Sequence, residues 1–175
     1  MEELFLSLKD EEWPLTIINH DRTIARAIVI DDEKNFYFVR VNRDDDFGKA
    51  SYIETSGGGV EDMESIEAAI HRELEEEMGI SVDILAKIGI VSDYYNCIHR
   101  HNINHYFLCK IRKFGNNHLT EDERNKYHLL RVCLKYKDAV KEYEDGRKTK
   151  IGRLVYNREM PILKRAYDII LEGDF

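Results

Sequence analysis

The sequence has few cysteines and lacks the patterns in which cysteine usually serves structure. Three occur in 175 residues, Cys97, Cys109 and Cys133, and no two are spaced as a CxxC pair. An odd number of cysteines without that spacing argues against a disulfide framework and against a zinc finger. We therefore expect reduced thiols and a cytoplasmic protein.

The sequence also lacks long hydrophobic runs and an excess of positive charge. No apolar run is long enough to span a bilayer, and the first residues, MEELFLSLKDEEWPL, are acidic where a signal peptide would be basic. The formal net charge is -8, so the surface as a whole should repel nucleic-acid backbones and anionic membranes. We expect neither as a partner, and a phosphate ligand would have to be bound locally by a metal or an arginine.

What is present suits a single domain over residues 1–175, because 43% of the chain is hydrophobic and no repeat, linker or low-complexity tract interrupts it. Residues 1–22 are interpreted as an N-terminal extension, a strand or hairpin that packs on an edge of the domain. Stretches rich in β-branched and aromatic residues predict the strands, at 23–30, 36–41, 50–55, 80–91, 105–111 and 129–134.

Helices are predicted at 66–78, 138–143 and 159–171. The connection 92–104 is interpreted as a polar and aromatic loop or the end of a hairpin, and 115–128 as an exposed polar connection. Strands followed by a helix, further strands and a terminal helix favour an α/β fold. In such a fold, a mixed sheet carries helices on both faces.

The most informative stretch is 56–82, SGGGVEDMESIEAAIHRELEEEMGISV. Ser65 is placed to cap the helix at its start, and Gly79 to end it. At about 100° per residue, one face of this helix carries three carboxylates, beside an apolar stripe, while Glu75 points toward solvent. The acidic face is Glu73, Glu76 and Glu77, and the stripe is Ile70, Leu74 and Met78.

Carboxylates crowded into the last turns of a helix oppose the helix dipole, at roughly 0.3–1 kcal/mol each, and repel one another. A hard divalent cation such as Mg2+ or Mn2+ would remove that cost. The simpler alternative is a solvated acidic face with no ligand.

The spacing of this stretch is specific. Five residues separate Gly58 from Glu64, seven more precede Arg72-Glu73-Leu74, and the run ends in Glu76-Glu77 and Gly79-Ile80. It resembles the signature of the Nudix hydrolase superfamily of MutT-like proteins, G-x5-E-x7-R-E-U-x-E-E-x-G-U, where U is aliphatic. Every specified position matches across 23 residues. Ser56 and Met63 differ from the Pro and Gly often found beside the signature, which bears on the conformation of the loop.

The resemblance implies a Nudix α/β/α sandwich with a central mixed β-sheet flanked by helices. It also implies Mg2+-dependent or Mn2+-dependent cleavage of the pyrophosphate bond in a small-molecule substrate, a nucleoside diphosphate linked to another group. By position, the metal ligands would be Glu73, Glu76, Glu77 and the main-chain carbonyl of Gly57. Arg72 would orient a glutamate with Glu64 as its partner, and Glu73 would bind metal or act as base. Many relatives are dimers, so a homodimer stays open.

Residues outside the signature are weaker candidates. Glu121 and Glu123 are candidates for a further catalytic base. Candidate substrate-binding residues are Arg26, Arg40, Tyr94, Tyr95 and His99. The alternation of Cys97, His99, His101 and His105 leaves a transition-metal site as an alternative to an ordinary polar hairpin.

Three other functions remain as alternatives. A catalytically silent Nudix-like module that senses nucleotides or binds a partner would be expected to lose signature glutamates, and this chain retains them. Isopentenyl diphosphate isomerase chemistry would require a positioned cysteine and further metal-binding histidines. An acidic helix of purely structural role would bind no metal. The sequence leaves the substrate open among oxidised nucleoside triphosphates, ADP-ribose, dinucleoside polyphosphates and nucleotide sugars.

Overall fold

The computed structural model describes residues 2–173 and 175, and within them eight strands form one mixed sheet. The strands run in the order β1-β6-β7-β2-β3-β4, while β5 pairs with β2 and β8 pairs with β3. Their bounds are β1 Leu4–Ser7, β2 His20–Ile30, β3 Phe36–Asp45, β4 Gly48–Glu54, β5 Ser56–Gly59, β6 Ile80–Tyr95, β7 Arg100–Phe114 and β8 Leu130–Leu134.

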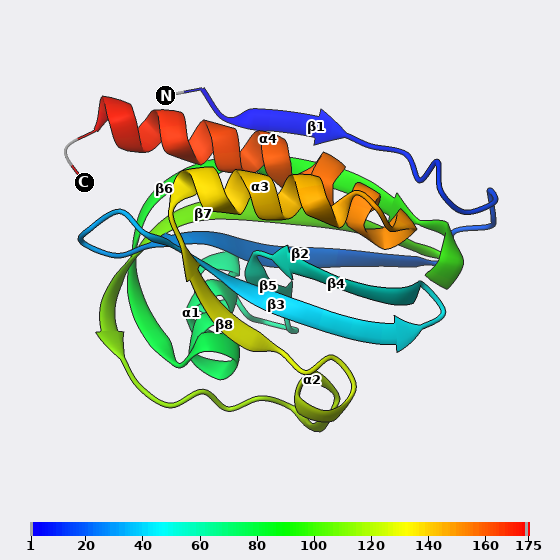
Figure 1. Cartoon of the computed structure of the whole chain (residues 1–175), viewed down its shortest axis with the longest axis horizontal. Coiled ribbons are helices and arrows are strands. Elements are labelled where there is room, and N and C mark those ends of the chain that lie inside the picture. Colours follow the sequence, from blue (N-terminus) through cyan, green and yellow to red (C-terminus); the bar gives the residue numbers. More distant parts are fainter. Residues whose placement is uncertain (1, 174) are drawn as a thin grey trace.

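Helices cover both faces of this sheet (Figure 1). One face carries α1, which packs on β2, β5 and β6, and the other carries α3 and α4, which pack together and on β4. The helices are α1 Ile66–Met78, α2 Glu121–Asn125, α3 Tyr136–Gly146 and α4 Lys150–Glu172, with a 3-10 turn at Asn96–Ile98. The α/β/α sandwich with a central mixed sheet is therefore confirmed.

The cleft described below arises where β2 and β3 separate. The two strands pair at the residues that flank their turn, Val29 with Tyr37 and Ile30 with Phe36. Beyond that point β4 pairs with β3, and β5, which follows β4 after one residue, pairs with β2. The chain thus passes from β4, which pairs with β3, to β5, which pairs with β2, and a hollow remains between β2 and β3.

The central strands are buried because helices cover them on both sides. From Ile24 to Ile30 every residue of β2 is buried, as expected for a strand between two helical layers. The apolar stripe of α1 is buried below the sheet, and Leu163 and Ala166 of α4 are buried above it. Among the described residues, no helix has the length and hydrophobicity to span a membrane.

Several elements are longer than their sequence patterns predicted. The polar stretch 92–104, interpreted as a loop or the end of a hairpin, is the end of the β6–β7 hairpin, because β6 extends to Tyr95 and β7 begins at Arg100 after one 3-10 turn. His99 turns the chain there with a φ of 55°. These polar residues adopt strand conformation because β6 pairs continuously with β7 from Gly89 to Tyr95. Pairing with a neighbouring strand here outweighs the weak strand propensity of the residues themselves.

The C-terminal helix was expected to begin at Glu159, just before Pro161, but α4 begins at Lys150 and passes through the proline. Thr149 caps it, since its hydroxyl accepts a hydrogen bond from the Gly152 backbone at 3.1 Å. Pro161 has no backbone N–H group and cannot make the helical hydrogen bond at its position. Packing of the buried residues in the first turns of α4 stabilises the helix despite this missing bond. The N-terminal segment forms one strand, β1, which pairs in parallel with β6 at the sheet edge.

Candidate active site

The glycine strand β5 brings backbone against the acidic helix. It pairs antiparallel with β2, and at Gly58 a side chain would overlap the carboxylate of Glu73. At Gly57, where φ is 153°, a Cβ would overlap the backbone of Ala25. At Gly57 the neighbouring backbone excludes any side chain, whereas at Gly58 a side chain would have to displace the carboxylate of Glu73.

Helix α1 holds its carboxylates in place by the local signals expected of it. The Ser65 hydroxyl accepts a hydrogen bond from the Ala68 backbone at 3.1 Å, and Gly79 ends the helix in the left-handed conformation, with φ 65° and ψ 35°. Glu73 and Glu77 are buried, Glu76 is partly buried, and Glu75 is exposed. The helix therefore turns one acidic face inward.

Glu77 is a buried carboxyl group bound to the glycine strand. Its Oε2 accepts hydrogen bonds from the Ser56 hydroxyl and from the Gly57 backbone, the latter at 3.1 Å. Burial raises the pKa of Glu77 to about 8, against the hydrogen bonds from Ser56 and Gly57 and with a smaller contribution from the negative charges of Glu73 and Glu123. A cation bound here would relieve the same electrostatic cost.

Arg72 joins the helix to the loop that precedes it. It binds Glu64 through Nε and Nη2 at 2.8 and 2.9 Å, and it reaches Glu73 Oε1 through Nη1 at 2.7 Å. Nη2 also donates to the Gly59 carbonyl at 3.0 Å. Hydrogen bonds from Arg72 lower the pKa of Glu64 to about 2, whereas burial raises the pKa of Glu73 against the effect of Arg72. The guanidinium therefore fixes the position of Glu73 relative to the glycine strand.

Donor chemistry in this region fits Mg2+ or Mn2+, because carboxylates and backbone carbonyls are hard oxygen ligands. As the side chains stand, however, residues 2–173 and 175 contain no group of three or more His, Cys, Asp or Glu arranged to hold a metal ion. Glu73 is turned to Arg72 and Glu77 to Ser56. Metal binding would require these carboxylates to exchange protein donors for the cation.

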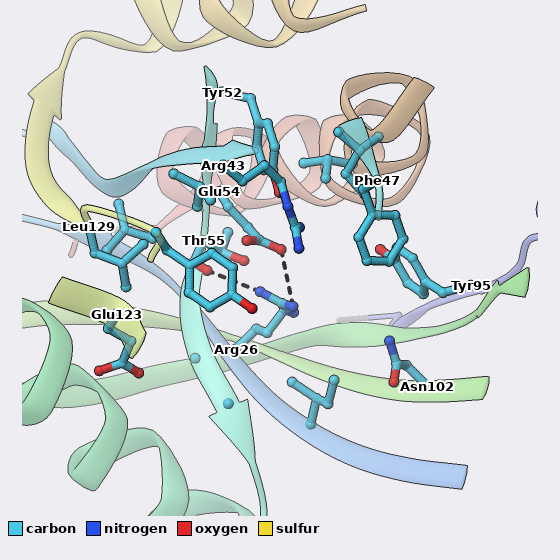
Figure 2. Close-up of a pocket in the computed structure, with 18 of the residues that line it drawn as sticks. Arg26, Arg43, Phe47, Tyr52, Glu54, Thr55, Tyr95, Asn102, Glu123 and Leu129 are labelled. Atoms are coloured by element: carbon cyan, nitrogen blue, oxygen red, sulfur yellow. Dashed lines mark hydrogen bonds and ion pairs between the residues drawn. The ribbon is translucent and has the colours of Figure 1, made fainter. Parts of the chain in front are cut away.

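A cleft of about 420 Å³ opens from this acidic region across the separated strands (Figure 2). Glu73, Glu77 and Glu123 line it on the side of α1 and α2, and Phe47 and Tyr95 line it at the opposite side. Its cationic lining residues are Arg22, Arg26, Arg43, Arg100, Lys126 and Arg158. A cleft lined by both carboxylates and cationic side chains suits a metal ion together with an anionic ligand.

Most of these arginines are already neutralised by the protein. Arg43 donates to Asp45 at 2.6 Å and lies 4.5 Å from the centre of the Phe47 ring. Arg26 binds Glu54 at 3.2 Å, and its Nη1 donates to the Thr55 carbonyl at 3.1 Å, as drawn in Figure 2. These pairs shape the wall and floor of the cleft.

A buried polar network centred on Glu159 adjoins the cleft, and its members Glu54, Thr55 and Arg158 line it. The carboxylate accepts hydrogen bonds from the Thr55 backbone at 2.8 Å, the Tyr106 hydroxyl at 3.0 Å and the Tyr143 hydroxyl at 2.6 Å. Arg158 binds Glu54 at 2.5 Å and Glu159 at 3.1 Å. The network fixes α4 to the strands that carry the cleft.

Residues predicted from the sequence fall into two groups. Those placed in or around the acidic end are Glu64, Arg72, Glu73, Glu76, Glu77 and Gly57, with Glu123 and Tyr95 lining the same cleft. Arg26 also lines the cleft, whereas Glu121 is exposed on α2.

Arg40, Tyr94 and His99 are not among the residues that line the cleft. Arg40 binds Glu142 at 2.8 Å. Tyr94 stacks on His101 with ring centres 4.5 Å apart, and the ring of His99 lies 2.9 Å from the hydroxyl of Thr16. Each of the three therefore has a partner elsewhere in the protein.

Several residues of the cleft have no signal in the local sequence, because strand register brings them together. Arg22, Glu54, Arg100 and Asn102 are examples. One signal was present for Arg158 and Glu159, which interrupt the apolar pattern of the last helix and are both buried. A charged pair at buried positions of an amphipathic helix indicates a polar network in the interior.

Fold and cleft together define an α/β sandwich protein whose glycine strand and acidic helix line a cleft that also carries several cationic side chains. The chain belongs to the Nudix family: the family model described as "NUDIX domain" matches residues 21–149. No curated protein matches the chain.

Solved structures with the same fold share little sequence with this chain. A NUDIX hydrolase from Nitrosomonas europaea has a TM-score of 0.65 and 16% identity, over 85% of this chain and 89% of that one. The E. coli ORF135 protein has a TM-score of 0.60 and 16% identity, over 89% and 94%. The MutT protein from Methanosarcina mazei Go1 has a TM-score of 0.54 and 15% identity, over 70% and 83%.

Proposed function

We propose that this Nudix protein is a Mg2+-dependent or Mn2+-dependent pyrophosphohydrolase that cleaves a nucleoside diphosphate linked to another group. The observation that carries this proposal is the pair of buried carboxyl groups, Glu73 and Glu77, held against a glycine strand at the acidic end of a cleft lined by arginines. Substrates that contain a pyrophosphate need a cation for their charge and a pocket for the attached group, and the cleft offers room for both.

Glu73, Glu76 and Glu77, with the Gly57 carbonyl, would hold the cation. When bound, it would neutralise phosphate charge and lower the pKa of a water molecule. Arg72 and Glu64 would keep Glu73 in place, since the Arg72 guanidinium binds both carboxylates.

Hydrolysis joins the oxygen of water to one phosphorus and breaks the bridging P–O bond, and the proton of the water must pass to a base. Glu123 is our candidate for that base. It lines the cleft, and its charge is felt by both Glu73 and Glu77. One of its oxygens, Oε2, accepts from the Thr120 backbone at 2.8 Å, which holds the side chain in a fixed orientation while the other oxygen is left to accept a proton.

The decisive experiment is product identification by mass spectrometry across nucleoside triphosphates, ADP-ribose, dinucleoside polyphosphates and nucleotide sugars, with Mg2+ and with EDTA. We expect nucleoside monophosphate or pyrophosphate as product with Mg2+ only, and loss of turnover in Glu77→Gln. Glu75→Gln is the matched control, because Glu75 is exposed on the same helix. Absence of turnover on every substrate would favour the silent nucleotide-binding module instead.

A cytoplasmic location and a homodimer are proposed from the sequence. The free thiols of Cys97, Cys109 and Cys133 suit a reducing compartment. Light scattering coupled to size exclusion would give the mass of the particle in solution.

A further inference from the structure

Two arginines in the cleft are left without a negative partner. Arg22 and Arg100 line the cleft, and neither forms an ion pair with any carboxylate in the part of the chain that the structure describes. Burial lowers the pKa of Arg100, and the positive charges of Arg22 and Arg26 lower it further. Two guanidinium groups that repel each other at the edge of a cleft indicate a place prepared for an anion.

Strand register brings these two arginines to the same face of the sheet. β2 and β7 are parallel neighbours, and Arg22 lies opposite Asn102 in their pairing. Arg100 precedes Asn102 by two residues, so both point to the same side of β7, which is the side of the cleft. Arg22, Arg100 and Asn102 therefore form one group, which we call the strand-face triad.

Two polar atoms of the triad are buried without a partner. The Nε of Arg100 and the Oδ1 of Asn102 make no hydrogen bond within the described residues. Asn102 is 1% exposed and lines the cleft, where Figure 2 shows it on the wall near Tyr95. Buried polar atoms without partners are rare in folded proteins. The Nε of Arg100 is a donor, so it points to a ligand that accepts a hydrogen bond, whereas the Oδ1 of Asn102 is an acceptor that an anion would not satisfy.

Gly59 fixes where the exposed member of the triad lies. A Cβ at this position would come within 2.6 Å of the Nε and Nη2 atoms of Arg22, so the guanidinium rests directly on the glycine backbone. The family signature begins at Gly58 and does not specify the residue that follows. The absence of a side chain at Gly59 leaves the space that the Arg22 guanidinium occupies.

We propose that Arg22, Arg100 and Asn102 form a subsite that binds a phosphoryl group of the substrate. The inference rests on the proposed function for the identity of its ligand. Arginine suits a phosphoryl group because its planar fork can donate two bonds to a pair of oxygens, and the amide of Asn102 can donate a further bond. In this arrangement one phosphoryl group of the substrate would lie against Arg22 and Arg100, and the part of the substrate bound through a metal would lie toward Glu73 and Glu77.

The test measures binding of pyrophosphate by isothermal titration calorimetry in EDTA, so that neither metal nor turnover is needed. We expect Arg22→Met and Arg100→Met each to weaken binding about tenfold or more, the loss typical of a charged hydrogen bond. Gly59→Ala should weaken it as well by displacing Arg22. Arg112→Met is the matched control, since Arg112 lies on the same strand as Arg100 but binds Asp83 at the surface.

The following results would contradict the proposed subsite. Unchanged affinity in both Arg22→Met and Arg100→Met overturns the subsite, and so does a lack of pyrophosphate binding by the unaltered chain. Arg22 is exposed, so its variant tests the subsite even if the Arg100 variant folds poorly. Equal binding of malonate and pyrophosphate would overturn the choice of a phosphoryl group. Failure of the proposed hydrolysis appears separately, as absent Mg2+-dependent turnover, and leaves the binding result intact.

Discussion

The carboxylate of Glu73 occupies the space that a side chain at Gly58 would need. The two residues belong to different elements, a helix and the strand that precedes it, and their contact sets the distance between the acidic face of α1 and the backbone of β5. A larger residue at either position would change that distance, so the first glycine of the family signature and its second glutamate act as one structural unit.

Replacing Gly58 by alanine should therefore move Glu73. We expect Gly58→Ala to lower kcat at least tenfold, about 1.4 kcal/mol in the barrier, and to lower the stability by about 1–3 kcal/mol through overpacking. Gly146→Ala is the control, because a Cβ there would meet Tyr52 at an ordinary 3.7 Å. Normal turnover in Gly58→Ala would show that the position of Glu73 is unimportant.

Metal binding should depend on the charge of Glu77 rather than on its hydrogen bonds. A glutamine at this position keeps an oxygen to accept from Ser56 and Gly57, so Glu77→Gln should fold with a nearly unchanged melting temperature in EDTA. Addition of Mg2+ should raise the melting temperature of the unaltered protein, since a ligand that binds the native state stabilises it, and should leave that of Glu77→Gln unchanged. Thermal unfolding at several Mg2+ concentrations measures both. An equal rise in the two proteins would remove Glu77 from the metal site.

The role of Glu123 can be separated from a general effect of acidic charge in α2. If Glu123 is the base, Glu123→Gln should reduce kcat by about 10²–10⁴ with little change in KM. Glu121→Gln removes the same charge two residues away, on the exposed side, and should retain activity. Steady-state kinetics with Mg2+ on the substrate found by mass spectrometry compares the two. Similar losses in both variants would indicate an electrostatic effect instead of proton transfer.

The acidic helix and its partners could be predicted because their signals are local. Ser65, Gly79 and the spacing of the glutamates all lie within one stretch, and the helix begins and ends where they indicated. The strands of the central sheet were recognised from their β-branched residues, but their lengths were not. The lengths of β6 and β7 depend on how far the two strands pair with each other. The register of that pairing cannot be read from a single sequence.

The arginines that line the cleft could not be predicted for the same reason. Arg22 and Arg100 are far apart in the sequence, and the parallel pairing of β2 with β7 places Arg22 opposite Asn102, two residues along β7 from Arg100. Arg40 was a reasonable candidate on its strand, yet Glu142 of α3 binds it outside the lining of the cleft. The position of Arg40 outside the cleft depends on how α3 packs against the sheet, and a local sequence pattern contains no information about that packing.

Acid should weaken the link between Arg72 and Glu64. The hydrogen bonds that Arg72 donates to Glu64 lower the pKa of that carboxyl group to about 2 from an ordinary 4.5. Glu64 therefore binds a proton less readily in the folded state than in the unfolded state. The stabilisation is therefore complete above pH 4.5 and is lost as the pH falls toward 2. Urea unfolding between pH 2 and 7 should show a shallower acid loss in Glu64→Gln than in the unaltered protein. The exposed Glu67→Gln should follow the unaltered curve.

The buried network beneath the cleft should be the most sensitive part of the fold. Arg158 is 1% exposed and binds both Glu54 and Glu159, so Arg158→Met would leave buried carboxylates with fewer positive partners. Removing one member of a buried ion pair costs roughly 3–5 kcal/mol, a large share of the roughly 5–15 kcal/mol typical of a domain. Lys164→Met removes a charge from an exposed position of the same helix and should cost less than about 0.5 kcal/mol. Chemical denaturation of the two variants measures the difference, and equal stability would mean that Arg26, 3.8 Å from Glu159, compensates fully for the lost guanidinium.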